Sequence, residues 1–168
     1  AGVSLIAFVE LFSKSHSMDR AALTLFGALF AGWMPAHLAL IRDLRPHGEA
    51  FVVLVFLAVW AADSAGYFVG RAFGKNALAA EVSPKKTWEG AVAGFAAAIV
   101  TALLVQRVSL ADALSPVGAI GLGAAIGAIG QLSDLAESMI TRDAGVKASG
   151  ALLPGHGGVC DRFDSYIL

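Results

Sequence analysis

Long uncharged stretches alternate with short charged ones along this chain. Residues 21–41, 90–106 and 116–132 contain no Asp, Glu, Lys or Arg, and residues 50–70 contain one such residue, Asp63. Each stretch falls within the roughly 17–25 apolar residues that a helix needs to cross a bilayer. The pattern therefore predicts four membrane-spanning helices.

A fifth and weaker candidate span lies at residues 2–12, which form a short stretch that carries Glu10. We interpret it as the end of a span that begins further upstream, and the apolar residues 166–168 as the start of another. The predicted fold class is all-α, a polytopic transmembrane helical bundle with about four or five spans in this chain. Residues 1–168 are expected to be one integral-membrane domain, truncated at both ends. The alternative, buried helices of a soluble all-α protein, is disfavoured because the uncharged runs leave no polar face for solvent.

Composition and charge narrow the class of protein further. Hydrophobic residues make up 57% of the chain and charged residues 15%, with 19 glycines in addition. Soluble domains reach only about 45–50% apolar residues with glycine included. The formal net charge of −1 argues against a nucleic-acid partner, which would require a basic surplus. The single cysteine, Cys160, excludes an intrachain disulfide and a multi-cysteine metal site.

Lysine and arginine are distributed unevenly between the two sides of the predicted bundle. If the spans alternate, residues 13–20, 71–89 and 133 onward share one side and carry nine of the twelve Lys and Arg residues. Cytoplasmic loops are enriched in these residues, so this side is expected to face the cytoplasm.

The span at residues 116–132 is rich in glycine and contains a GxxxG pattern from Gly123 to Gly127. Small residues at this spacing let helix backbones approach closely in lipid. The pattern fits either a homodimer seam or packing against a neighbouring helix of the same chain, and the second interpretation is favoured.

The first charged motif lies in the second predicted span. Asp63, Tyr67 and Arg71 recur at i, i+4 and i+8, so a helix presents them on one face. A carboxylate inside a span is costly and usually faces a polar cavity. We expect a ligand-binding or metal-binding role, with a structural Asp63–Arg71 interaction as the alternative.

The second motif is the run Ser83, Pro84, Lys85, Lys86 and Thr87. Pro84 disfavours a helical conformation at Ser83, and the next span should begin near Thr87. Backbone N–H groups and two lysines then meet at a helix start, an arrangement that attracts phosphate. The alternative is a basic anchor that contacts lipid headgroups.

The third motif contributes four carboxylates. Asp134, Glu137 and Ser138 share a helical face by their spacing, and so do Asp161 and Asp164. Carboxylates gathered at one site repel unless a cation lies between them, and their oxygens suit a hard ion such as Mg²⁺. Between the two sets, residues 154–158 read Pro-Gly-His-Gly-Gly, which predicts an irregular loop whose backbone N–H groups can approach an anion.

These last stretches resemble the signature of phosphatidate cytidylyltransferases, also called CDP-diacylglycerol synthases. That signature runs Ser-x-x-Lys-Arg-x4-Lys-Asp, then Pro-Gly-His-Gly-Gly, then Asp-Arg-x-Asp. The first two motifs also resemble this family, and the resemblance covers about residues 60–165. Thr141 and Ala148 depart from the pattern, which has Lys and Asp there, so the activity of this variant is left open. The matching residues are Ser138, Arg142, Lys147, Pro154, Gly155, His156, Gly157, Gly158, Asp161, Arg162 and Asp164.

The resemblance implies a Mg²⁺-dependent nucleotidyltransferase of phospholipid biosynthesis. CTP and phosphatidic acid would give CDP-diacylglycerol and pyrophosphate at a bacterial inner membrane, with the active site facing the cytoplasm. A second cation and a homodimer are further expectations. Two alternatives remain: a related nucleotidyl or phosphoryl transferase acting on another lipid phosphate, and an ion-coupled membrane transporter.

Site roles follow from this resemblance together with the motifs. The expected metal ligands are Asp134 and Asp161, supported by Glu137 and Asp164. His156 is either a proton donor to pyrophosphate or a structural loop residue, and it joins Asp134, Asp161, Lys147 and Arg142 in the predicted catalytic set. The expected substrate-binding residues are Asp63, Tyr67, Arg71, Ser83, Lys85, Lys86, Ser138, Gly155, Gly157, Gly158 and Arg162.

Overall fold

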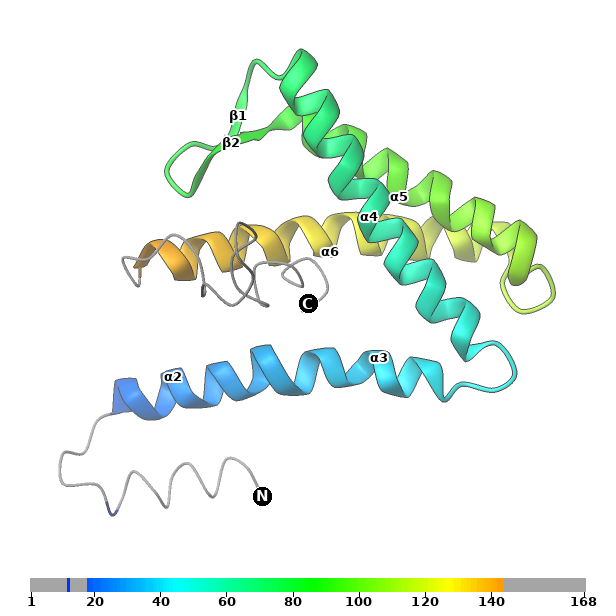
Figure 1. The fold of residues 1–168 in the computed structure, drawn as a ribbon, viewed down its shortest axis with the longest axis horizontal. Helices are drawn as coiled ribbons and strands as arrows, with labels where there is room; N and C mark the ends of the chain where they lie inside the picture. The colour runs from blue at the N-terminus through cyan, green and yellow to red at the C-terminus, as the bar shows by residue number, and fades with distance from the viewer. Residues whose placement is uncertain (1–11, 13–17, 144–168) are drawn as a thin grey trace, which may run out of the picture.

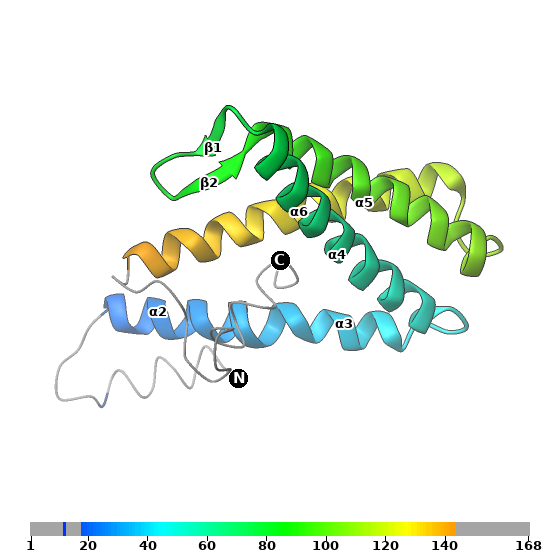
Figure 2. The ribbon, with the colours of Figure 1, turned by 45° about the horizontal axis from the view of Figure 1, so that its top comes forward.

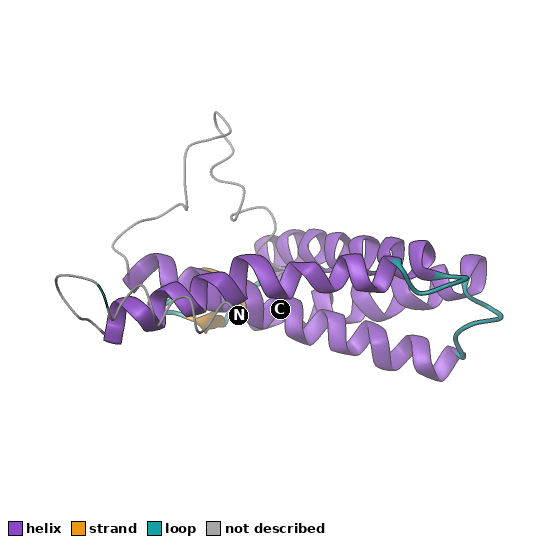
Figure 3. Cartoon of the chain, turned by 90° about the horizontal axis from the view of Figure 1, so that it is seen from below, coloured by secondary structure: helices purple, strands orange, loops and turns teal. Residues whose placement is uncertain are grey.

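The computed structural model describes Phe12 and residues 18–143, and most of these residues are helical. Figure 3 shows the strands as one small patch among helices. In chain order the elements are α2 (Met18–Ala28), the π-helix η1 (Leu29–Trp33), α3 (Met34–Arg42), α4 (Gly48–Phe73), β1 (Ala77–Ala79), β2 (Ser83–Thr87), α5 (Trp88–Ser109) and α6 (Pro116–Asp143).

Three helices are long and apolar enough to cross a membrane: Gly48–Phe73, Trp88–Ser109 and Pro116–Ile140. They coincide with three of the four predicted spans and confirm the all-α, polytopic class of membrane protein. Large apolar side chains such as Trp60, Phe68 and Val108 lie on their outer surfaces. Such surfaces suit lipid, which solvates apolar side chains as well as a protein core does.

The first predicted span, residues 21–41, differs from the expectation of one regular helix. It is divided among α2, η1 and α3, which follow one another without a gap. Pro35 in the first turn of α3 has no backbone N–H to donate to the preceding turn. A short π-helical segment is one way to absorb such a disturbance. In Figures 1 and 2 the segment formed by α2, η1 and α3 extends in roughly the same direction as α6 and joins α4 through a short turn. The weaker fifth candidate, residues 2–12, lies outside the described residues except for Phe12.

Helices α4 and α5 cross (Figure 1), and their backbones approach closely where glycines of one helix meet the other. A Cβ atom built on Gly94 would lie 2.8 Å from the backbone oxygen of Ala62, and one built on Gly90 would lie 2.6 Å from that of Gly66. Any larger side chain at these two positions would force the backbones apart. The crossing therefore depends on glycine.

Helix α6 packs against α5 through the GxxxG pattern. A Cβ atom on Gly123 would lie 2.7 Å from Ile99 Cα, and one on Gly127 would lie 3.1 Å from Ala98 Cβ. This confirms the interpretation that Gly123 and Gly127 serve packing within the chain. Gly121, by contrast, has open space where its side chain would be.

A short antiparallel hairpin, β1 and β2, connects α4 to α5, with Ala77 paired to Thr87. The all-α prediction contained no strand. Pro84 disfavours helix at Ser83, as expected, but the pairing partner Ala77–Ala79 carries no β-specific pattern in the sequence. The hairpin stands at the end of the bundle where α4 ends and α5 begins (Figure 1).

Candidate active site

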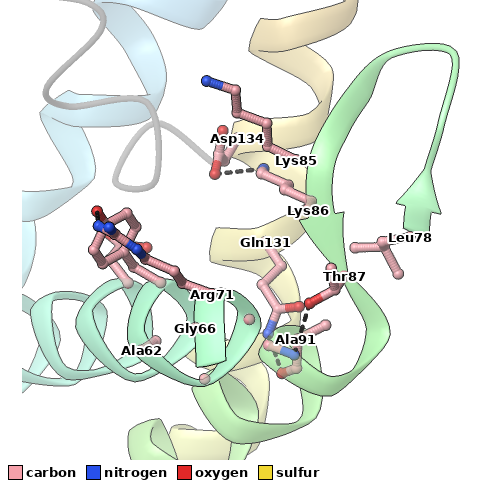
Figure 4. A pocket seen from close by; sticks show the side chains of 15 residues that line it. Ala62, Gly66, Arg71, Leu78, Lys85, Lys86, Thr87, Ala91, Gln131 and Asp134 are labelled. Carbon is pink, nitrogen blue, oxygen red and sulfur yellow. Dashed lines mark hydrogen bonds and ion pairs between the residues drawn. The ribbon is translucent and has the colours of Figure 1, made fainter. Parts of the chain in front are cut away.

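A cavity of about 720 Å³ opens between α4, the hairpin, α5 and α6. Its backbone wall is formed by the glycines of the α4–α5 crossing, including Gly66, Gly90 and Gly94. Close packing of the helices therefore also brings the polar groups of several segments to one place (Figure 4). The polar side chains that line the cavity are Asp63, Tyr67, Arg71, Lys85, Lys86, Thr87, Gln131 and Asp134.

Helix α4 contributes Asp63, Tyr67 and Arg71, which all line the cavity. Their shared face was predicted from the i, i+4, i+8 spacing, and the helix places them as that spacing requires. Arg71 Nη1 donates a hydrogen bond to Tyr67 Oη at 2.9 Å. The phenol thus holds the guanidinium beside the cavity, where its remaining N–H groups can receive an anion.

The hairpin contributes Lys85 and Lys86 from β2, directly before α5. Thr87 is the N-cap of α5, and its Oγ1 accepts a hydrogen bond from Gly90 N at 3.2 Å. The predicted start of this helix near Thr87 is therefore confirmed. The two lysines stand at the positive end of the α5 dipole, which favours negative charge.

An ion pair between Lys86 and Asp134 joins β2 to α6 across the cavity (Figure 4). The two side chains are only 25% and 30% exposed, and Lys86 Nζ itself is buried with no hydrogen-bond partner among the described residues beyond this carboxylate. An ammonium group offers three donors. The Lys86 group is thus charge-compensated but retains hydrogen-bonding capacity toward the cavity.

Gln131 lines the cavity but was not among the predicted site residues. Its Nε2 donates to the backbone oxygen of Ala91 at 3.0 Å, which ties α6 to the first turns of α5. Since Gln131 precedes Asp134 by three positions, the two share a helical face. A lone amide at the end of an apolar run, three residues before a carboxylate, is the sequence signal that could have identified it.

Four further predicted residues are described but do not line the cavity: Ser83, Glu137, Ser138 and Arg142. Ser83 begins β2, and the other three follow Asp134 along α6, with Arg142 exposed in its last turn. The remaining predicted residues lie outside the described part of the chain: Lys147, Gly155, His156, Gly157, Gly158, Asp161, Arg162 and Asp164.

The described residues contain no group of three or more His, Cys, Asp or Glu side chains that could hold a metal ion. Two carboxylates, Asp63 and Asp134, nevertheless reach the cavity. Magnesium is usually held by one or two carboxylates together with waters and substrate phosphates. The chemistry of these donors therefore fits Mg²⁺ held jointly with a phosphorylated ligand.

Comparison with known proteins identifies the family. Residues 2–168 match the model of the cytidylyltransferase family. The chain belongs to this family. A phosphatidate cytidylyltransferase of Brucella suis is 45% identical over 141 residues, which cover 84% of this chain and 52% of the relative.

Two further relatives carry the same name. The Haemophilus influenzae protein is 50% identical over 122 residues, covering 71% of this chain and 42% of the relative. The Bacillus subtilis protein is 36% identical over 163 residues, covering 97% of this chain and 60% of the relative. The chain thus spans about half the length of the curated relatives it matches, and the family resemblance seen in the motifs is confirmed.

Proposed function

We propose that this chain carries the active site of a phosphatidate cytidylyltransferase, which converts CTP and phosphatidic acid to CDP-diacylglycerol and pyrophosphate. The observation that carries the proposal is the cavity in which Arg71, Lys85 and Lys86 converge beside Asp134 at one end of three apolar helices. Membership of the cytidylyltransferase family and the names of the relatives support the same reaction.

The cations suit the substrates. A triphosphate and a lipid phosphate bring several negative charges together, and their mutual repulsion must be offset before they can react. Arg71 and the two lysines supply positive charge from α4 and β2. The N-terminus of α5 adds backbone N–H groups and the positive end of its dipole.

In the Lys86–Asp134 pair each charge compensates the other before substrate binds. A phosphate oxygen that binds Lys86 can compensate part of the ammonium charge that the Asp134 carboxylate compensates in its absence. Asp134 then becomes available to a cation that accompanies the phosphate. Substrate binding would thus replace the Lys86–Asp134 pair by two pairs, Lys86 with the phosphate and Asp134 with the cation. Neither buried charge would be left uncompensated.

We assign Mg²⁺ to Asp134 and Asp161, with Glu137 and Asp164 in support, and a second cation beside it is part of the same proposal. When bound, the ion would supply charge neutralisation and polarisation at the phosphate oxygens. In the reaction, an ionised phosphate oxygen of phosphatidic acid attacks the α-phosphorus of CTP, and the bond to pyrophosphate breaks. Since that oxygen is already ionised at neutral pH, alignment by the protein cations matters more than a general base.

Other predicted residues complete this proposal. Arg142, Lys147 and the 155–158 loop would hold the phosphates, and His156 would either protonate pyrophosphate or shape the loop. Ser83, Ser138 and Arg162 would support substrate binding, and Asp63 and Tyr67 would line the nucleotide side of the cavity.

The proposed location is a bacterial inner membrane. We place the active site on the cytoplasmic side because nine of the twelve Lys and Arg residues fall on that side of the predicted bundle. CTP would then enter from the cytosol, while the lipid arrives sideways between helices. A homodimer remains part of the proposal, although Gly123 and Gly127 are used for packing against α5.

The reaction is tested with the intact protein in lipid nanodiscs, labelled CTP and phosphatidic acid. CDP-lipid should form only when both substrates and a divalent cation are present, and chelation should stop it. Product from another lipid phosphate but not from phosphatidic acid would favour the related transferase. Ion-coupled solute uptake without nucleotide turnover would favour a transporter.

The metal assignment has a separate test. Asp161→Asn should abolish turnover while the thermal unfolding midpoint stays close to that of the wild type. Full activity in this variant would refute the assignment of Mg²⁺ to Asp161 and leave the reaction itself to the substrate assay.

A further inference from the structure

Asn76 and Glu89 close the base of the hairpin. Asn76 Nδ2 donates to Glu89 Oε1 at 2.8 Å, and the Asn76 backbone N–H donates to Glu89 Oε2 at 3.4 Å. The backbone oxygen of Asn76 in turn accepts from Trp88 N at 3.0 Å. We refer to the contact of Asn76 with Glu89 as the hairpin clamp. Neither residue was among the predicted site residues.

The hairpin is too small to fix its own geometry. β1 has three residues and β2 has five, and the strand register is irregular between Ala77 and Ala79. An isolated two-stranded hairpin is marginally stable at best in water. Its orientation therefore depends on whatever holds its base and on the contacts its side chains make with the bundle.

The clamp lies between the two chain segments that lead into and out of the hairpin. Asn76 follows the C-cap of α4, Gly74, by two residues, and Glu89 lies in the first turn of α5. Lys85 and Lys86 precede Glu89 by only a few positions on β2. A clamp at this base thus restricts the movement of both lysines relative to α4 and α5.

The use of a carboxylate here has a second consequence. Glu89 stands near the N-terminus of α5, where a phosphate would be favoured, and a carboxylate directed into the cavity would repel it. Glu89 is not among the described residues that line the cavity, and its two oxygens are engaged by Asn76. The clamp therefore keeps this negative charge away from the anion site.

We propose that Glu89, held by Asn76, is a positioning residue that fixes the hairpin so that Lys85 and Lys86 meet the substrate phosphates. This inference rests on the proposed function. Without the clamp the lysines would have to be ordered when substrate binds, and that ordering would weaken binding. Once substrate is bound, the reacting atoms would still align, so the chemical step should change little.

The test uses the intact protein in nanodiscs and three variants. Glu89→Ala should raise KM for CTP about tenfold, the effect of losing one charge-assisted hydrogen bond, with kcat within about twofold of the wild type. Glu89→Gln keeps an acceptor for Asn76 Nδ2 and should recover most of the loss. Glu81→Ala, an exposed glutamate in the turn between the strands, is the matched control and should behave as wild type.

Two readouts do not depend on turnover. Hydrogen exchange of the amides at residues 77–87 should accelerate in Glu89→Ala and not in Glu81→Ala. Binding of inorganic triphosphate, followed by calorimetry, should weaken about tenfold in Glu89→Ala alone.

The outcomes separate this inference from the proposed function. Unchanged exchange and unchanged triphosphate binding in Glu89→Ala would overturn the positioning role, whatever the reaction is. A fall in kcat at constant KM would also overturn it, because the carboxylate would then act in the chemical step. Weakened triphosphate binding in a protein that makes no CDP-lipid would support the clamp and refute the proposed reaction.

Discussion

The two ends of the helical bundle both carry charged residues, but they use them differently. At the end formed by the α3–α4 and α5–α6 turns (Figure 1), Arg42 Nη2 lies 3.5 Å from Glu49 Oε1, with side chains 66% and 82% exposed. There His47 Nε2 also lies 3.2 Å from Asp112 Oδ2. At the cavity end, Lys86 and Asp134 pair while largely withdrawn from solvent.

The difference in solvent exposure between these ion pairs distinguishes a candidate binding site from an ordinary charged surface. Exposed ion pairs contribute about 0–1 kcal/mol because water solvates each partner nearly as well. A withdrawn pair has lost much of that solvation, and each partner is correspondingly more responsive to a new ligand charge. What distinguishes the cavity end is therefore the convergence of charges from α4, β2 and α6 on one concave surface, rather than their number.

The strongest test of the difference between the two ends is to remove one charge from each end. Lys86→Met should lower kcat/KM for CTP by roughly a hundredfold or more, because a phosphate loses its cation and Asp134 loses its partner. Arg42→Gln should change kcat/KM by less than about twofold.

Lys86→Arg serves as the control for charge and should fall between these two. Thermal unfolding checks that each variant is folded. Activity of Lys86→Met within a few-fold of Arg42→Gln would show that the cavity is not the site.

The next largest effect concerns the packing that creates the cavity. Gly94→Ala should destabilise the protein by about 1–3 kcal/mol, because its Cβ would press on the Ala62 carbonyl and separate α4 from α5. Gly121→Ala meets open space and should leave stability unchanged or slightly raised. Denaturation in detergent compares the two, and equal midpoints would contradict the close crossing.

Two glutamines, one at each end of the bundle, test the same difference between the ends. Gln106 Nε2 donates to the Leu114 oxygen at 2.8 Å at the turn end, and Gln131 makes a similar bond to Ala91 at the cavity end. Gln106→Leu and Gln131→Leu should each lower stability by about 1 kcal/mol.

Only Gln131→Leu should also reduce kcat/KM, by about fivefold, since it orients the face of α6 that carries Asp134. Unfolding and turnover assays on both variants check this. A matching loss of turnover in Gln106→Leu would mean that general destabilisation explains both.

The smallest effect is expected at the His47–Asp112 pair, in which the Asp112 side chain is 74% exposed. Asp112→Asn should change the free energy of unfolding by at most about 0.5 kcal/mol, and high salt should remove even that. Chemical denaturation at low and high ionic strength measures the difference. A loss of unfolding free energy well above about 1 kcal/mol would indicate that the contact between the α3–α4 and α5–α6 turns contributes substantially to stability.

Features that depend on local spacing could be predicted from the sequence. The shared face of Asp63, Tyr67 and Arg71, the start of α5 at Trp88 after Thr87, and the packing role of Gly123 and Gly127 all follow from helical periodicity or capping. The hairpin, the place of Gln131 and the clamp could not be predicted. Each depends on which residues of separate segments come into contact. The sequence at Ala77–Ala79 and Asn76 has no local pattern that indicates which residues they will contact.

The sequence by itself determined that this chain is a membrane protein of the cytidylyltransferase family with its polar chemistry near the ends of apolar helices, because runs of uncharged residues and tight motifs are local properties. Tertiary structure alone decided that Lys86 pairs with Asp134 and that Glu89 accepts hydrogen bonds from Asn76 at the base of the hairpin. Both contacts join segments that are separated in the sequence, β2 with α6 in one case and the chain after α4 with the first turn of α5 in the other, so no local pattern specifies them.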